Sequence, residues 1–259
     1  MSTTRHVTFV AAVNNRSILE KNLLASPCVQ ESNCQLLIQE NFTSAARAYN
    51  QAIDKSLNDL IVFAHQDMVF PKSWLSDLES AISILDKDDP HWGVLGCYGV
   101  TVDGEGRGYV YSFDIHGAPF NRPAPVQTLD EIVLIFRKSS GLRFNESIPH
   151  FHLYGADICL SAQKQGMGCY AISAFCVHNA QQSFIHPPEF YKCYWHFKRI
   201  WKESLPVQTT CIRVTRFNLP MFRRRLNEAY LRYIAGKHYG SKRLESVEHV
   251  LQRFDNPQK

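Results

Sequence analysis

Short apolar runs alternate with amphipathic segments along the first 180 residues. Four β-branched or apolar runs that end in polar residues are expected to be buried strands: 7–13, 34–39, 59–64 and 92–100. Between them, apolar positions recur three and four residues apart in 44–56 and again after Pro71, as in helices that bury one face. Strands that alternate with helices indicate βαβ units, and hence an α/β fold with helices on both faces of a sheet.

The pattern is less regular after residue 100. Residues 101–125 contain several Gly and Pro residues and are expected to form a long surface excursion. Strand character returns at 126–138, a helix is expected over 153–165, and a last strand over 170–177. The predicted fold class is therefore a Rossmann-like, mixed and mostly parallel sheet, followed by a helical extension.

Polar residues follow three of the predicted strands directly. They are Asn14, Asn15, Glu40, Asn41, His65 and Asp67. In open sheets of this kind ligands bind beyond the carboxyl ends of the strands. The sequence therefore predicts a ligand site at this edge.

Composition limits the class of protein. A chain of 259 residues with 45% hydrophobic residues can form one large domain, or a domain and an extension. No apolar run is long enough for a transmembrane helix, and residues 1–13 do not resemble a signal peptide. The 8 cysteines include no Cys-x-x-Cys pair, and most lie in apolar runs. We expect a soluble, cytoplasmic protein with reduced cysteines.

Charge is distributed unevenly along the chain. Residues 1–189 carry a net charge of −6 and are expected to form the catalytic domain, whereas residues 190–259 carry +10 and are expected to form a basic, aromatic-rich helical extension. Apolar positions in 218–234 recur at helical spacing between arginines, which predicts a basic amphipathic helix. This helix could pack on the catalytic domain or make peripheral contact with an anionic membrane. Nucleic-acid binding is disfavoured, because no module for it is visible and the remainder of the chain is acidic.

The phosphate-binding motifs of common nucleotide enzymes are absent. Val13-Asn14-Asn15-Arg16-Ser17 contains no glycine, which argues against an NAD-type site, and no Walker-type sequence occurs. A divalent cation can still hold an anionic nucleotide, and it needs a carboxylate near a strand end. Asp67, with His65 beside it, meets that need; the alternative is that Asp67 only begins the turn before Pro71.

Two further side chains are candidates for chemistry. Asp157 lies in an apolar sequence that opens a helix, where a carboxylate either has a function or interacts with the helix dipole. His178 follows the last predicted strand and is either a ligand or a structural histidine. A zinc site is disfavoured, because His150, His152 and Cys159 are a poor ligand set.

Four segments together resemble glycosyltransferase family 2-like proteins with the GT-A fold, the group that includes many bacterial rhamnosyl- and related transferases. The matching segments are 7–15, 41–54, 60–67 and 151–160, within a similarity that covers roughly residues 7–180. The most specific elements are His65-Gln66-Asp67 and Tyr154-Gly155-Ala156-Asp157, in this order.

The resemblance implies a role for particular residues. His65-Gln66-Asp67 is similar to the family's Asp-x-Asp motif, with His in the first position, so Asp67 should contact Mg²⁺ or Mn²⁺ and His65 should assist. Asp157 corresponds to the catalytic base, and His178 to a histidine that completes the metal or diphosphate site. The residues that correspond to the nucleotide and donor-binding edge are Ala12, Asn14, Glu40, Asn50, His65 and Gln66.

The function implied is inverting, metal-dependent glycosyl transfer. A UDP-, dTDP- or GDP-linked sugar would be the donor, and a hydroxyl of a glycan or lipid-linked acceptor would receive the sugar in polysaccharide or glycoconjugate synthesis. A carboxylate that deprotonates the hydroxyl and a cation that offsets the diphosphate charge suffice for this chemistry. The alternative is a non-catalytic nucleotide-sugar or glycan-binding module on the same fold.

Overall fold

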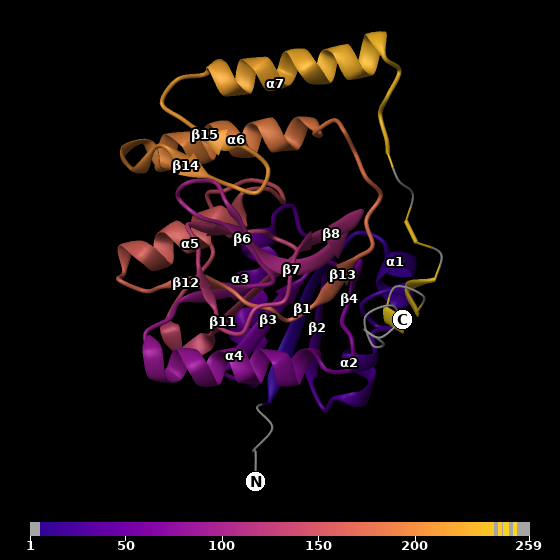
Figure 1. Cartoon of the computed structure of the whole chain (residues 1–259), viewed down its shortest axis with the longest axis vertical. Coiled ribbons are helices and arrows are strands. Elements are labelled where there is room, and N and C mark those ends of the chain that lie inside the picture. The colour runs from indigo at the N-terminus through magenta and orange to yellow at the C-terminus, as the bar shows by residue number, and fades with distance from the viewer. Residues whose placement is uncertain (1–5, 241–242, 245, 249–250, 253–259) are drawn as a thin grey trace.

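The computed structural model describes residues 6–240, 243–244, 246–248 and 251–252. In this part of the chain a large sheet lies between two layers of helices (Figure 1). Its seven strands follow the order β2-β1-β3-β11-β5-β12-β9. They are β1 (Val7–Val13), β2 (Gln35–Glu40), β3 (Leu60–Ala64), β5 (Val94–Gly96), β9 (Ala124–Pro125), β11 (Val133–Arg137) and β12 (Cys169–Ala171).

The large sheet is mixed, as predicted, but it has as many antiparallel as parallel pairings rather than mostly parallel ones. Strand β1 pairs in parallel with β2 and β3, and β12 pairs in parallel with β5. Strand β11 is antiparallel to both of its neighbours, β3 and β5. Because β1, β2 and β3 are parallel, their carboxyl ends meet at one edge, where the polar residues noted above begin.

The two faces of the sheet have separate cores. Phe9 and Ala11 of β1 pack with helices on one face, whereas Val10 packs with helices on the other. This alternation follows from the strand geometry, in which successive side chains point to opposite faces. The first face is covered by α1 (Arg16–Lys21), α2 (Pro27–Glu31) and α4 (Trp74–Asp88), and the second by α3 (Ala45–Lys55) and α5 (Tyr154–Lys164).

Helix α3 illustrates how the sequence determines an element. The Ser44 side chain accepts a hydrogen bond from the Arg47 backbone N–H, which caps the first turn. Ala45, Ala48, Tyr49 and Ala52 are all buried, as their spacing predicts.

A second sheet corrects three predictions. It contains β4 (Met68–Val69), β6 (Tyr98–Val100), β7 (Gly106–Ser112), β8 (Asp114–Gly117), β10 (Thr128–Leu129) and β13 (Cys176–His178). The expected strand 92–100 is divided between the two sheets as β5 and β6, and 170–177 is divided as β12 and β13. The expected excursion 101–125 includes the β7–β8 hairpin.

The reason for the missed hairpin is the glycine content of β7. A Cβ atom at Gly108, which has a φ of +144°, would lie 2.2 Å from the Cys97 carbonyl oxygen. Glycine therefore permits the close pairing of β7 with β6, although in the sequence it resembles a loop signal.

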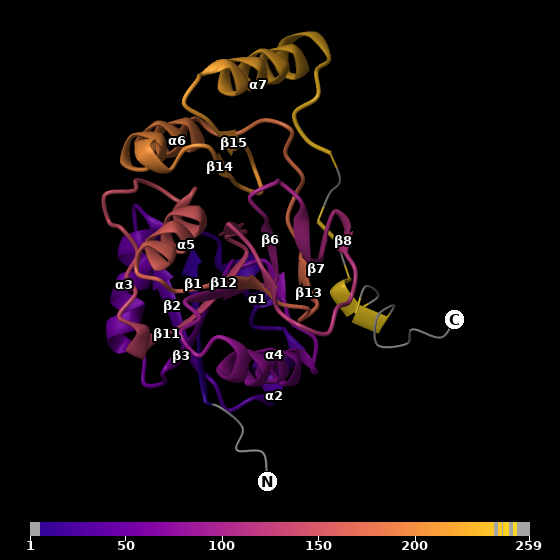
Figure 2. The ribbon, with the colours of Figure 1, turned by 60° about the vertical axis from the view of Figure 1, so that its left-hand side comes forward.

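The extension forms further layers at one end of the molecule. It contains α6 (Pro188–Ile200), β14 (Val207–Gln208), β15 (Arg213–Val214), α7 (Leu219–Ala229) and a π-helical turn over Tyr230–Ile234. Phe190 and Phe197 of α6 share a core with Leu160 of α5. Helix α7 lies beyond α6 in both views (Figures 1 and 2). Within the described residues, no helix has the length and apolar character needed to span a membrane.

A matched pair of truncations tests the position of β11. Leu134 is fully buried in the core between the sheet and helices α3 and α5, whereas Leu57 is 85% exposed. We expect Leu134→Ala to lower the free energy of unfolding by about 2–5 kcal/mol, because it leaves a cavity. Leu57→Ala should change it by less than about 0.5 kcal/mol. Urea denaturation measures both, and equal effects would contradict the assignment of β11 to the centre of the sheet.

Candidate functional site

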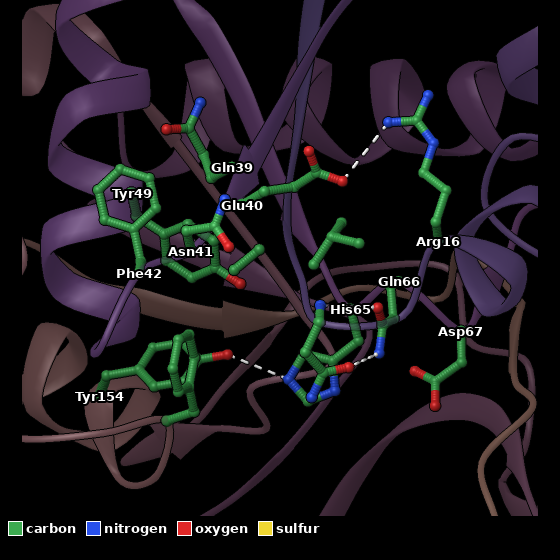
Figure 3. Close-up of a pocket in the computed structure, with 14 residues that line it drawn as sticks. Arg16, Gln39, Glu40, Asn41, Phe42, Tyr49, His65, Gln66, Asp67 and Tyr154 are labelled. Atoms are coloured by element: carbon green, nitrogen blue, oxygen red, sulfur yellow. Dashed lines mark hydrogen bonds and ion pairs between the residues drawn. The ribbon is translucent and has the colours of Figure 1, made fainter.

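A cavity of about 640 Å³ opens at the carboxyl ends of β1, β2 and β3 (Figure 3). Its lining comprises Ala12, Val13, Asn14, Arg16, Gln39, Glu40, Asn41, Phe42, Tyr49, His65, Gln66, Asp67, Phe151 and Tyr154. The predicted ligand edge is therefore a concave surface with polar residues and several aromatic rings, which is the usual composition of a small-molecule site.

Backbone pairing brings His65, Asp67 and His178 together. Residues 65–67 form the turn between β3 and β4, in which the Met68 N–H donates to the His65 carbonyl over 3.2 Å. Strand β4 then pairs with β13 so that Met68 lies opposite His178. As a result His178 Nε2 lies 3.4 Å from Asp67 Oδ1. The two histidines and Asp67 each offer a ligand atom, and these atoms lie within 4.8 Å of one another.

Neighbouring side chains fix both imidazole rings. Ser112 Oγ lies 3.2 Å from His178 Nδ1, and the Tyr154 hydroxyl lies 3.0 Å from His65 Nε2. Metal-binding histidines commonly have such a partner on the second ring nitrogen, which orients the ring. One carboxylate and two imidazoles fit a divalent cation, and they suit Mn²⁺ better than Mg²⁺, which prefers oxygen ligands.

Arg243 contacts Asp67 from the opposite side. Its Nη1 donates to Asp67 Oδ2 over 2.9 Å and to the Asn179 carbonyl over 2.5 Å. The Leu244 N–H in turn donates to Asn179 Oδ1 over 2.6 Å, which fastens this segment beside β13. Arg243 thus occupies one oxygen of Asp67, and the other faces His178.

The charge states of this group follow from its surroundings. Burial alone would raise the pKa of Asp67, but His178, His65 and Arg243 lower it well below its ordinary value. Burial and the neighbouring His178 lower the pKa of His65. Asp67 is therefore an anion and His65 is neutral near pH 7, as a cation site requires.

Gln66 joins the ends of two strands. Its Oε1 accepts hydrogen bonds from the Asn14 and Asn15 backbone N–H groups over 3.2 and 3.0 Å, and its Nε2 donates to Asn14 Oδ1 over 2.6 Å (Figure 3). Glu40 Oε1 lies 3.5 Å from Arg16 Nη1 at the rim of the cavity. The residues that line this one cavity include Ala12, Asn14, Glu40, His65, Gln66 and Asp67.

Three predicted site residues do not line the cavity: His178, which contacts Asp67, and Asn50 and Asp157, which lie elsewhere. Asn50 holds a loop, because its side chain bonds to both the N–H and the carbonyl of Phe144 and to Glu146 Oε1. Asp157 is only 1% exposed, and its Oδ1 accepts a 2.7 Å hydrogen bond from Trp201 Nε1. Neither residue lines the cavity. Burial raises the pKa of Asp157 to about 6, although the hydrogen bond from Trp201 acts to lower this pKa.

Other cavity residues were not predicted from the sequence. Tyr154 belongs to the Tyr-Gly-Ala-Asp element and could have been found by its position beside Asp157. Phe42 and Phe151 follow β2 and precede α5, so their places at the strand-end edge could also have been inferred. Arg243 carries no local signal, because its contact with Asp67 spans 176 positions of the sequence.

The chain has limited similarity in sequence to known proteins. No protein-family model matches the chain. A protein of Fuscovulum blasticum described as ATP synthase subunits region ORF 6 is 30% identical over 133 residues, or 48% of this chain, and the match spans about half (53%) of that protein's length.

Similar solved structures include a mannosyltransferase. GalNAc-T7 with UDP, GalNAc and Mn²⁺ is 10% identical, with a TM-score of 0.50 over 91% of this chain and 57% of that one. The mannosyltransferase PcManGT from Pyrobaculum calidifontis, with GDP-Man and Mn²⁺, is 13% identical, with a TM-score of 0.49 over 90% and 71%. S. aureus TarS is 13% identical, with a TM-score of 0.48 over 89% and 44%. The chain therefore has the mixed α/β fold of GT-A glycosyltransferases, as the sequence resemblance implied.

A metal titration tests the candidate cation site. We expect Asp67→Asn to weaken Mn²⁺ binding at least about tenfold, because the substitution removes the one anionic ligand of the group. Asp103→Asn is the matched control, since Asp103 is exposed in the β6–β7 turn. Calorimetry with Mn²⁺ alone measures the affinity, and equal affinities of wild type and Asp67→Asn would remove Asp67 from the site.

Proposed function

We propose that this protein is a glycosyltransferase that moves a sugar from a nucleotide-diphosphate donor to an acceptor hydroxyl with inversion at the anomeric carbon. The observation that carries the proposal is the cavity at the carboxyl ends of β1–β3, with the group of His65, Asp67 and His178 at one side. Its placement supports binding of the donor in the cavity with its diphosphate near Asp67.

Different residues of the cavity would bind different parts of the donor. Ala12, Asn14 and Glu40 would contact the nucleoside of a UDP-, dTDP- or GDP-sugar, while Gln66 keeps the strand ends in register. His65, Asp67 and His178 would hold Mn²⁺ or Mg²⁺, which supplies positive charge to the leaving diphosphate. Asn50 would act from outside the cavity, through the loop at Phe144 and Glu146.

The chemical step needs one base and no covalent intermediate. The acceptor oxygen forms a bond to the anomeric carbon as the bond to the diphosphate oxygen breaks, and the diphosphate leaves with the electron pair. A carboxylate takes the hydroxyl proton. We assign this role to Asp157, because the family resemblance implies it and its raised pKa suits a general base. Since Asp157 is 1% exposed and does not line the cavity, the carboxylate would have to leave Trp201 and become accessible to the acceptor.

The cellular role follows from the same assignment. We place the enzyme in polysaccharide or glycoconjugate synthesis, within the rhamnosyltransferase-like group, with a glycan or lipid-linked acceptor at the inner face of the membrane. Residues 1–189 would supply the donor site and residues 190–259 the acceptor side. The seclusion of Asp157 favours the second candidate function, a non-catalytic nucleotide-sugar-binding module on the same fold.

Donor hydrolysis tests the proposed function. Purified protein is incubated with UDP-, dTDP- and GDP-sugars, with Mn²⁺ or with chelator, and nucleoside diphosphate release is measured. We expect release from at least one donor, dependent on Mn²⁺ and abolished in Asp67→Asn. Tight Mn²⁺-dependent binding of the same donors without any release would instead support the binding module.

The base assignment gives a separate prediction. Asp157→Asn keeps an oxygen that can accept the Trp201 hydrogen bond but removes the basic group, so we expect turnover to fall about 100-fold or more with donor affinity unchanged. Since a raised pKa leaves Asp157 protonated at low pH, wild-type turnover should fall below about pH 6. The variant's residual activity should lack this acid limb.

Trp201→Phe is the control for the last experiment. It removes the hydrogen bond to Asp157 but retains the carboxylate, so most turnover should remain. Normal turnover in Asp157→Asn, with the acid limb intact, would contradict the assignment and transfer the role to another carboxylate such as Glu146 or Asp130.

A further inference from the structure

Helix α7 and the turn after it present an apolar stripe to solvent. Phe222, Leu226, Tyr230 and Tyr233 are 59%, 55%, 52% and 78% exposed, and their spacing of three and four residues places them along one face. The sequence left two alternatives for this helix, packing on the preceding domain or contact with an anionic membrane. The apolar stripe itself faces solvent.

The opposite face of α7 holds the helix in place. Met221 is buried in the core shared with α6, and Glu228 is 6% exposed. The Glu228 carboxylate lies 2.9 Å from His186 Nδ1 and 3.2 Å from Arg224 Nε, and the Tyr191 hydroxyl donates to it. Polar contacts therefore fix the orientation of the helix. In this orientation the apolar stripe is exposed.

The charge around the stripe has one sign. Arg223, Arg225 and Arg232 are exposed, and helical spacing places Arg223 on one flank of the stripe and the other two on the opposite flank. Glu228 is the one acidic residue within 219–234, all of which the structure describes, and it faces inward. The outer face thus combines apolar residues with positive charge, and the Arg225 guanidinium also lies over the Tyr191 ring, 5.2 Å from the ring centre.

The position of α7 relates this face to the cavity. Strand β1 begins beside the N-terminal end of the molecule and runs toward the end where α6 and α7 lie (Figures 1 and 2). The carboxyl ends of the parallel strands therefore point toward the α7 end. A partner surface bound to α7 would therefore lie at the same end of the molecule as the cavity at the strand ends.

We propose that α7 docks on an anionic bilayer, with the apolar stripe at the level of the acyl-chain boundary and the arginines among anionic headgroups. Interfacial helices have this arrangement of a basic face and an apolar face. A second copy of the chain fits less well, because a symmetric contact would bring arginines against arginines. If the purpose of docking is to reach a lipid-linked acceptor, that purpose rests on the proposed function. The docking itself does not depend on the proposed function.

Vesicle co-sedimentation of the full chain tests the docking. Vesicles of phosphatidylglycerol with phosphatidylcholine are compared with vesicles of phosphatidylcholine alone, at low and high salt. We expect binding to the anionic vesicles that weakens with salt, because salt screens the arginine attraction. Arg223→Ser/Arg232→Ser should weaken partitioning about tenfold or more. Phe222→Ser/Leu226→Ser should also reduce it, and Leu57→Ser, a change at an exposed leucine elsewhere, should not.

Three results would overturn the inference. One is the absence of wild-type binding to anionic vesicles at low salt, and another is equal binding of a stripe variant whose circular dichroism matches wild type. The third is a dimer in light scattering that Phe222→Ser/Leu226→Ser dissociates, which would assign the stripe to a second copy. Donor hydrolysis in the absence of vesicles is measured in parallel, so that a failure of docking is distinguished from a failure of the transferase proposal.

Discussion

The candidate cation site depends on the antiparallel pairing of β4 with β13. Strand β4 begins directly after Asp67 and β13 ends at His178, so two pairs of opposed residues determine how near these side chains lie. The Asn179 N–H extends the contact by donating to the Asp67 carbonyl over 2.9 Å. The distance between ligand atoms is thus set by backbone hydrogen bonds, which are stiffer than the side chains they position. A cation would enter a site that folding has already arranged.

The local sequence was sufficient for strands β1, β2 and β3 of the large sheet and for the polar edge at which they end. Strands β1 and β3 are nearly continuous apolar runs, because both of their faces are covered, whereas β2 is half-buried at the edge of the sheet. The polar residues at the ends of these three strands mark the cavity. The second sheet could not be predicted in the same way. Its strands are short and depend on partners distant in sequence, and the glycines of β7 resemble a loop until the Cys97 carbonyl that they accommodate is known.

Side-chain direction explains the remaining differences. Asp157 was singled out correctly as a carboxylate in an apolar context, but its environment is set by Trp201, 44 positions later in the chain. Asn50 was expected at the nucleotide edge because of the family resemblance, yet its amide bonds to the backbone of Phe144, 94 positions away. Periodicity assigns a residue to a face of an element. It does not identify the partner that a distant segment brings to that face.

The contact of Arg243 with Asp67 makes this carboxylate a point of competition between two positive charges. Asp67 presents one oxygen to the guanidinium and the other to His178, so part of its negative charge is already balanced within the chain. A cation that bound at Asp67 would share the carboxylate with Arg243 or displace the guanidinium, and its affinity would therefore depend on how firmly Arg243 is held.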